Sequence, residues 1–239
     1  MFKNCDINKL DVDLINDDIS DELTEIMSKY NSDKGYGLCH AFNEYNTYPP
    51  NGVCHNYTYF YNKLFNEHRY EPMNIFEMGV GVPACMGVGS WAGSLLGWKE
   101  YFPNSKIYSA DFDKDFLYTD ERIISYYVDQ ENQESIISLW TNMTNIQFDL
   151  IIDDGPHTYS SNFLFYTNSI NKLNQYGIYI IEDVNVDFID NLYNEIIKYN
   201  LEHDLTCDII KLIIPYPKKF THPSEAICKM NNLIILQKK

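Results

Sequence analysis

Two short acidic motifs in the second half of the chain carry the residue types best suited to chemistry. Asp154 and His157 delimit an Asp-Gly-Pro-His motif, and Glu182-Asp183 follows further along the chain. Each motif comes directly after an apolar run typical of a buried strand, so the three carboxylates could converge at one edge of a sheet. Carboxylate oxygens at that density suit Mg²⁺ or Ca²⁺ rather than zinc. We therefore expect Asp154, Glu182 and Asp183 to be metal ligands.

A divalent cation at this point would activate a hydroxyl group. Metal coordination lowers the pKa of a bound water or alcohol by several units, and imidazole is the side chain best suited to take the released proton near neutral pH. We expect His157 to be the catalytic base, with Asp154 as the alternative. The competing interpretation is an acidic cluster that caps helix N-termini, which fits Asp153 better than Asp154.

The elements that position these motifs alternate between strand and helix patterns. Apolar runs that predict strands cover residues 75–78, 106–110, 123–128, 148–152 and 177–181. Helical patterns cover residues 93–101, 133–141, 160–173 and 188–199. This alternation predicts a parallel sheet with helices on both faces. Two further runs, 208–214 and 232–236, have no helical pattern between them and are expected to form an antiparallel pair at the sheet edge. The fold class is therefore α/β and Rossmann-like, with a mostly parallel seven-stranded sheet.

The N-terminal part of the chain has a different character. Residues 1–70 are polar, acidic and rich in Asn and Tyr, with helices expected after Ser20 and over residues 57–68. We expect a helical cap over residues 1–70 and a sheet domain over residues 71–239.

Each of the five predicted parallel strands has a carboxylate at or near its C-terminal end. These residues are Glu77, Asp111, Asp129, Asp154 and Glu182. Ligands of open α/β sheets bind outside those strand ends, and clustered acids are costly unless cations or hydroxyls meet them. The pattern predicts a positively charged ligand, a ribose, a metal ion, or all three.

The first strand ends in a glycine-rich turn that favours a particular cofactor. Glu77 precedes Gly79 and Gly81, and with Ala84 the turn formally satisfies the dinucleotide pattern GxGxxA. The acid before the first glycine could hold a cationic amino-acid group, the next helix begins late, and Asp111 lies further downstream than dinucleotide sites expect. These features favour S-adenosylmethionine over a nicotinamide cofactor, with Asp111 expected on the ribose.

Two more segments could complete a binding site for S-adenosylmethionine, the methyl donor. Asp129 and Gln130 could together recognise an adenine edge, although such pairs also form capping turns. Residues 55–61 are rich in tyrosine and are expected mostly to pack, with one or two rings lining the site because a sulfonium cation and a sugar face both favour aromatic surfaces.

Composition excludes several classes of function. The 239 residues include 18 Lys+Arg against 34 Asp+Glu, a formal charge of −16, which argues against nucleic-acid binding. Six cysteines without a CxxC pair favour reduced thiols in a cytoplasmic protein. The acidic N-terminal segment is unlike a signal peptide, and no apolar run is long enough to span a bilayer, so no membrane partner is expected. The sequence leaves a homo-oligomer open.

Residues 93–103 resemble the GGxSLxxWxxYFP stretch of the macrolide-sugar O-methyltransferases of the mycinamicin and macrocin type. Further matching pieces follow the same order over residues 32–184, and they are residues 33–35, 55–57, 77–81, 128–130, 152–157 and 181–183. The resemblance implies a class I fold, S-adenosylmethionine and Mg²⁺ as cofactors, and methylation of a sugar hydroxyl. It implies the metal ligands and the histidine base already named. The residues expected to contact the donor are Lys34, Tyr57, Glu77, Gly79, Gly81, Ser94, Asp111, Asp129, Gln130 and Asp153.

The chain also departs from this family. The loop over residues 82–91 is different, and Gly155-Pro156 replaces the usual Gly-Ser. We also expect no room for the larger N-terminal domains of the family. Abundant Asn, Ile, Lys and Tyr indicate another biological setting, so we expect a nucleotide-activated, capsular-polysaccharide or natural-product sugar as acceptor. A catechol-type O-methyltransferase, an NAD-dependent oxidoreductase and a non-catalytic binding module are the alternatives.

Overall fold

A seven-stranded sheet forms the centre of the protein, in the order β3-β2-β1-β4-β5-β7-β6. The computed structural model describes residues 1–14, 21–35, 55–81, 91–215 and 229–239. The strands are β1 (Asn74–Met78), β2 (Lys106–Asp111), β3 (Ile123–Tyr127), β4 (Phe148–Asp153), β5 (Leu173–Ile181), β6 (Cys207–Ile213) and β7 (Asn232–Lys238). The first five pair in parallel, and β7 lies antiparallel between β5 and β6. The mostly parallel sheet with an antiparallel C-terminal pair is confirmed.

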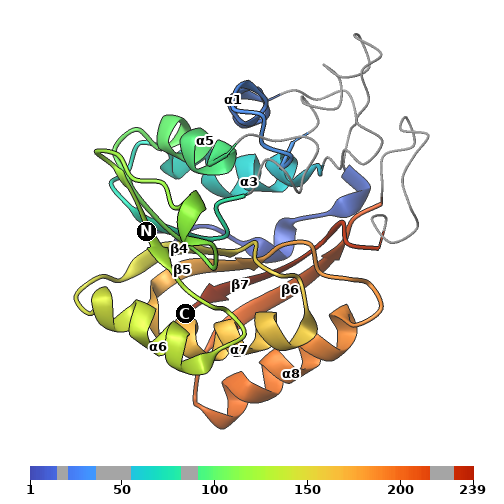
Figure 1. The fold of residues 1–239 in the computed structure, drawn as a ribbon. Coiled ribbons are helices and arrows are strands. Elements are labelled where there is room, and N and C mark those ends of the chain that lie inside the picture. Colours follow the sequence, from blue (N-terminus) through green and yellow to red (C-terminus); the bar gives the residue numbers. More distant parts are fainter. Residues whose placement is uncertain (15–20, 36–54, 82–90, 216–228) are drawn as a thin grey trace.

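Helices cover both faces of this sheet (Figure 1). One face carries α1 (Glu22–Lys29), α3 (Tyr57–Phe65) and α5 (Gly93–Tyr101). The other carries α6 (Gln133–Asn142), α7 (Tyr159–Ser169) and α8 (Ile189–Glu202). Five single-turn 3₁₀ helices complete the described elements, at Ile7–Lys9, Val12–Leu14, Asn66–His68, Lys114–Phe116 and Ile170–Lys172. Each face buries its own apolar cluster against the sheet, as expected for a doubly covered parallel sheet.

Local sequence signals explain where the helices begin. Asp21 caps α1, because its side chain accepts a hydrogen bond from the backbone N–H of Thr24 at 2.8 Å. Thr158 and Ser161 form a reciprocal capping box at the start of α7. That cap fixes the point where the chain leaves the loop containing His157.

Two helices end earlier than predicted, and α8 ends at Glu202 instead of residue 199. The helix expected over residues 160–173 ends at Ser169, and Leu173 already belongs to β5, where it pairs with Phe148. The strand is irregular there, with Tyr176 at φ 64° before Gly177. Apolar residues near this junction fit a helical period as well as a strand, so the pattern could not locate the boundary. The helix expected over residues 57–68 likewise ends at Phe65 and continues as a 3₁₀ turn.

Other expectations fall partly or wholly outside the described residues. These include the turn at 49–52, most of the loop at 82–91 and most of the connection between β6 and β7. In the described part of the chain, no helix is both long enough and apolar enough to cross a bilayer. Cys5 and Cys207 are free thiols.

Candidate functional site

The site lies where β1 and β4 run side by side and the chain departs to opposite faces of the sheet. This is the switch point at which open α/β sheets bind ligands. A cavity of about 560 Å³ opens there, beyond the C-terminal ends of the parallel strands. The predicted site residues that line it are Glu77, Gly79, Gly81, Ser94, Asp111, Asp129, Gln130, Asp154, His157 and Asp183.

Gly79 allows the end of β1 to approach the loop after β4. Its φ is +95°, and a Cβ at this position would lie 2.3 Å from the carbonyl oxygen of Asp154. Only glycine meets both conditions without displacing backbone. The close approach places the glycine turn directly beside Asp154.

Glu77 is a fully buried carboxylate that α5 holds in place. Its Oε1 accepts a hydrogen bond from the Ser94 hydroxyl at 2.7 Å, and its Oε2 accepts one from the Trp98 indole N–H. Burial raises the pKa of Glu77, against the opposing effect of the Lys34 ammonium, whose Nζ lies 3.4 Å from Oε1. The match between residues 93–103 and the methyltransferase motif therefore includes the two residues that orient this acid.

Lys34 is buried among carboxylates from three strand ends. Its Nζ donates to Asp154 Oδ2 at 2.6 Å and to Glu182 Oε2. Burial disfavours its charge, but Asp154, Glu182 and Glu77 together raise the pKa of Lys34 well above its usual value. Burial works against ionisation of Asp154 as well, yet Lys34 and His157 lower the pKa of that carboxyl. One ammonium thus faces three acids, which leaves the cluster short of positive charge.

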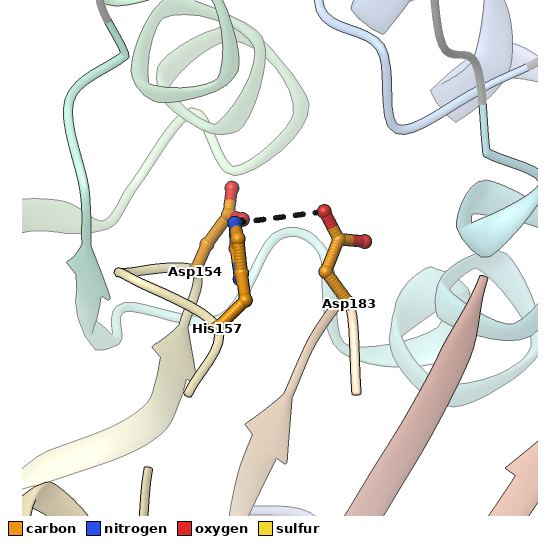
Figure 2. A group of neighbouring side chains, drawn as sticks. All are labelled: Asp154, His157 and Asp183. Carbon is orange, nitrogen blue, oxygen red and sulfur yellow. Dashed lines mark ion pairs between the residues drawn. The ribbon is translucent and has the colours of Figure 1, made fainter. Parts of the chain in front are cut away.

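Asp154, His157 and Asp183 converge on one point of the cavity (Figure 2). One ligand atom from each lies within 4.8 Å of the others. His157 Nε2 is 3.9 Å from Asp154 Oδ1 and 3.7 Å from Asp183 Oδ2. His157 and Asp183 have φ values of 56° and 53°, a left-handed conformation that is uncommon outside glycine and that occurs at functional sites.

The donor atoms of this cluster fit a hard divalent cation. Mg²⁺ is commonly held by one or two carboxylates and completes its shell with water or substrate oxygens. Asp154 Oδ1 and Asp183 Oδ2 are such carboxylate oxygens, and both face the cavity side where His157 lies. They could hold the ion while the imidazole, a poorer ligand for Mg²⁺, keeps its nitrogen for a proton.

Gln130 lines the cavity and has a buried side-chain oxygen that lies against Gly155. Its Nε2 donates to Asp153 Oδ1 at 2.7 Å, which turns its Oε1 the other way. That oxygen is buried without a hydrogen-bond partner among the described residues, and a Cβ on Gly155 would lie 1.9 Å from it. A buried acceptor without a donor costs free energy until a ligand supplies one.

Known proteins resemble this chain in sequence over about two thirds of its length. No family model matches the chain. The mycinamicin VI 2''-O-methyltransferase of Micromonospora griseorubida is 31% identical over 164 residues, which is 68% of this chain and 36% of that protein. The demethylmacrocin O-methyltransferase of Streptomyces fradiae is 29% identical over 163 residues, which is 68% of this chain and 36% of that protein. The chain is a homologue of the macrolide-sugar O-methyltransferases.

A solved structure of this group shares the fold. The mycinamicin methyltransferase MycE, in complex with Mg, SAH and mycinamicin VI, superposes with a TM-score of 0.60 at 20% identity, over 92% of this chain and 55% of that one. This likeness confirms the class I methyltransferase fold. The chain aligns with only about a third of the curated relatives' length and about half of the solved structure.

Four predicted site residues do not line the cavity. Lys34 and Glu182 lie behind Asp154, and both oxygens of Glu182 are taken, Oε2 by Lys34 and Oε1 by the Tyr61 hydroxyl. Glu182 is therefore outside the three-residue cluster, because neighbouring residues at the strand end point in different directions. Tyr57 lies behind Asp183, to which its hydroxyl donates.

Asp153 is the fourth of these residues. It is fully buried and accepts hydrogen bonds from Gln130 and, at 3.0 Å, from Asn162. Burial raises its pKa to about 6, against those two hydrogen bonds. It lies behind Gln130, where it orients the amide, and it does not line the cavity.

Sequence reasoning gave no role to three residues of this site. The Trp98 indole N–H donates to Glu77, and the Tyr61 hydroxyl donates to Glu182. His55 Nε2 lies 3.3 Å from Asp183 Oδ1. Burial opposes the charge of His55, but Asp183 and Asp33 outweigh it and raise the pKa of the ring. A polar aromatic edge in an otherwise apolar helix pattern, as at Tyr61 and Trp98, is the signal that could have identified them.

Proposed function

We propose that the chain is an S-adenosylmethionine- and Mg²⁺-dependent O-methyltransferase that acts on a sugar hydroxyl. The observation that carries this proposal is the imidazole of His157 between two carboxylates, beside a cavity at the switch point of a methyltransferase fold. The sugar O-methyltransferases among its homologues support the same reaction class.

The donor would lie along the ends of β1, β2 and β3. Glu77 and the glycine turn would face its amino-acid end, Asp111 its ribose, and Asp129 with Gln130 its adenine edge. Asp111 Oδ2 already accepts from the Val80 N–H at 2.9 Å, which fixes the carboxylate while leaving lone pairs for hydroxyls. The negative charge that Lys34 leaves uncompensated would favour a sulfonium donor and a metal ion together.

His157 would take the proton of the acceptor hydroxyl during methyl transfer. Asp154 and Asp183 would hold Mg²⁺, which when bound lowers the pKa of a coordinated hydroxyl. The acceptor oxygen forms a bond to the methyl carbon, the carbon–sulfur bond breaks, and S-adenosylhomocysteine leaves as a neutral sulfide. The carboxylates at 3.7 and 3.9 Å from Nε2 would stabilise the imidazolium that His157 becomes.

The cavity lining favours an acceptor without phosphate groups. Its described residues include seven carboxylates and neither lysine nor arginine: the acids are Asp33, Glu77, Asp111, Asp129, Glu131, Asp154 and Asp183. A diphosphate would be repelled by that lining. We therefore place a nucleotide-activated sugar last. A natural-product glycoside, which the homologues methylate, comes first, and a capsular-polysaccharide sugar comes second. Residues 1–70 would form a cap on the donor-binding domain of residues 71–239.

An acceptor panel tests the proposal. The purified chain is incubated with methyl-labelled S-adenosylmethionine and Mg²⁺ against glycosides, sugar nucleotides and catechols, and methylated products are measured by mass spectrometry. We expect label on a sugar hydroxyl and loss of product with EDTA. Methylation of catechols alone would assign the phenol reaction, and donor binding without any product would assign a binding module. Calorimetric binding of NAD in place of S-adenosylmethionine would assign an oxidoreductase.

Two histidine variants test the base. His157→Ala should lower kcat by roughly 10²- to 10⁴-fold, because a general base contributes about that factor, with donor affinity within about twofold of wild type. The matched control is His203→Ala, since His203 is exposed and stacks on Tyr199 away from the cavity. Full activity of His157→Ala would assign the proton to Asp154 or to solvent.

A further inference from the structure

One oxygen of Asp183 is occupied by groups from the N-terminal segment. The Tyr57 hydroxyl donates to Asp183 Oδ1 at 2.6 Å, and His55 Nε2 lies 3.3 Å from the same oxygen. Both rings are buried, and neither lines the cavity. Asp183 thus has one oxygen facing the protein and the other, Oδ2, facing His157.

The rings of Tyr57 and His55 are held by each other and by Asn231. Their rings stack with centroids 4.6 Å apart and planes 10° apart. His55 Nδ1 lies 2.9 Å from Oδ1 of buried Asn231, whose Nδ2 donates to the Ile214 carbonyl at 3.3 Å. That second hydrogen bond sets the Asn231 amide so that its oxygen faces the ring. The stack is therefore anchored both in α3 and at the start of β7.

A fixed partner matters because a carboxylate turns easily about its terminal bond. That torsion is broad and roughly twofold, so it does not by itself define where each oxygen points. Asp183 also has a left-handed backbone conformation and is the second residue after β5, outside any regular element. The hydrogen bond from Tyr57 and the contact with His55 both fall on Oδ1, and they distinguish it from Oδ2.

We propose that Tyr57, backed by His55, is a positioning residue that turns Asp183 Oδ2 toward Asp154 and His157 and thereby sets the affinity of the cluster for a divalent cation. This inference rests on the metal site of the proposed function. It gives Tyr57 a role through Asp183, in place of the direct donor contact that the sequence predicted. Hydrogen-bond partners of metal-binding side chains change metal affinity by roughly 10- to 100-fold when they are removed.

Tyr57→Phe tests the proposal because it removes the hydroxyl and keeps the stacked ring. The matched control is Tyr166→Phe: Tyr166 is equally buried and its hydroxyl donates to Asn200 Oδ1, also at 2.6 Å, between α7 and α8. Both variants lose one hydrogen bond of 2.6 Å, and Tyr57→Phe also loses a longer contact of its hydroxyl with the Met230 carbonyl at 3.3 Å. A general loss of stability should therefore be similar in the two. Melting temperatures measured on each variant check that they fold.

The main readout is Mn²⁺ binding to the full chain without acceptor, followed by electron paramagnetic resonance and calorimetry. We expect the dissociation constant for Mn²⁺ to rise roughly tenfold in Tyr57→Phe, with the dissociation constant for S-adenosylmethionine within about twofold of wild type. Tyr166→Phe should leave both constants unchanged. In turnover assays, excess Mg²⁺ should restore most of the kcat of Tyr57→Phe.

Two results would overturn the inference, and they are distinguishable from failure of the proposed function. Mn²⁺ affinity equal to wild type in Tyr57→Phe would remove the positioning role, even in an active methyltransferase. An equal loss of Mn²⁺ affinity in Tyr166→Phe would make the effect one of general stability. If wild type bound Mn²⁺ and Tyr57→Phe bound it weakly, the inference would stand even where no acceptor was methylated.

Discussion

Replacing Lys34 by methionine removes the buried ammonium that the described residues place among Glu77, Asp154 and Glu182. The methionine keeps most of the side-chain volume, so the change is mainly one of charge. Removing one partner of a buried ion pair typically costs about 3–5 kcal/mol, because it leaves the other charge uncompensated. Three carboxylates share this ammonium, so we expect a loss in the upper part of that range for the free energy of unfolding without metal.

Added Mg²⁺ should reverse part of this loss. A ligand that binds only the folded state stabilises it by about 2.7 kcal/mol at a hundred times its dissociation constant. Without the nearby ammonium the carboxylates repel each other more strongly and attract the ion more strongly. Mg²⁺ should therefore stabilise Lys34→Met more than it stabilises wild type.

Urea unfolding with and without Mg²⁺, followed by tryptophan fluorescence and circular dichroism, measures both effects. Lys29→Met is the control, since the Lys29–Glu100 pair is largely exposed and pairs of that kind contribute about 1 kcal/mol or less. A Lys34 variant no less stable than the Lys29 variant would refute the electrostatic argument. So would an equal or smaller effect of Mg²⁺ on the Lys34 variant than on wild type.

Three further predictions concern single positions. Gly79→Ala should lower the free energy of unfolding by at least about 2 kcal/mol, because of the left-handed φ and the overlap of the new Cβ with the Asp154 carbonyl. It should also abolish S-adenosylmethionine binding measured by calorimetry. Normal affinity would contradict the close approach of the two segments. Burial raises the pKa of Cys5 and of Cys207 from 9.0 to about 11. At pH 8 both thiols should therefore be alkylated roughly 100-fold more slowly in the native than in the unfolded protein, as measured by peptide mass spectrometry. The rate in the native protein should rise as the pH rises toward 11. Thr158→Ala should lower the free energy of unfolding by about 1 kcal/mol through loss of the α7 cap, and an unchanged urea midpoint would show that the cap contributes nothing.

The sheet and the strand-end acids could be predicted because each leaves a local pattern. Short apolar runs locate the strands, and each run has an acid at or near its C-terminal end, such as Glu77, Asp111 or Asp154. Parallel strands bring these ends to one edge of the sheet. The cavity accordingly contains these residues. The boundary between α7 and β5 left no such pattern, since the same apolar residues satisfy both periods.

Contacts between distant segments could not be predicted from the sequence. Lys34 meets Asp154 across 120 positions and Glu182 across 148, and nothing local marks a lysine as buried. Glu182 and Asp183 are adjacent, so the sequence could not tell which of them reaches the cavity and which turns back toward Lys34 and Tyr61. That choice depends on the backbone at the end of β5, where Asp183 has a positive φ.

The last strand of the chain, β7, lies between β5 and β6 and joins β6 to the sheet. Among the strands that the structure describes, β6 hydrogen-bonds to the sheet only through β7, although it precedes β7 in the chain. During synthesis, β6 therefore has no sheet partner until residues 232–238 have emerged from the ribosome. Deleting those seven residues would detach two strands rather than one, and would turn β5 into an open edge that could pair with another molecule.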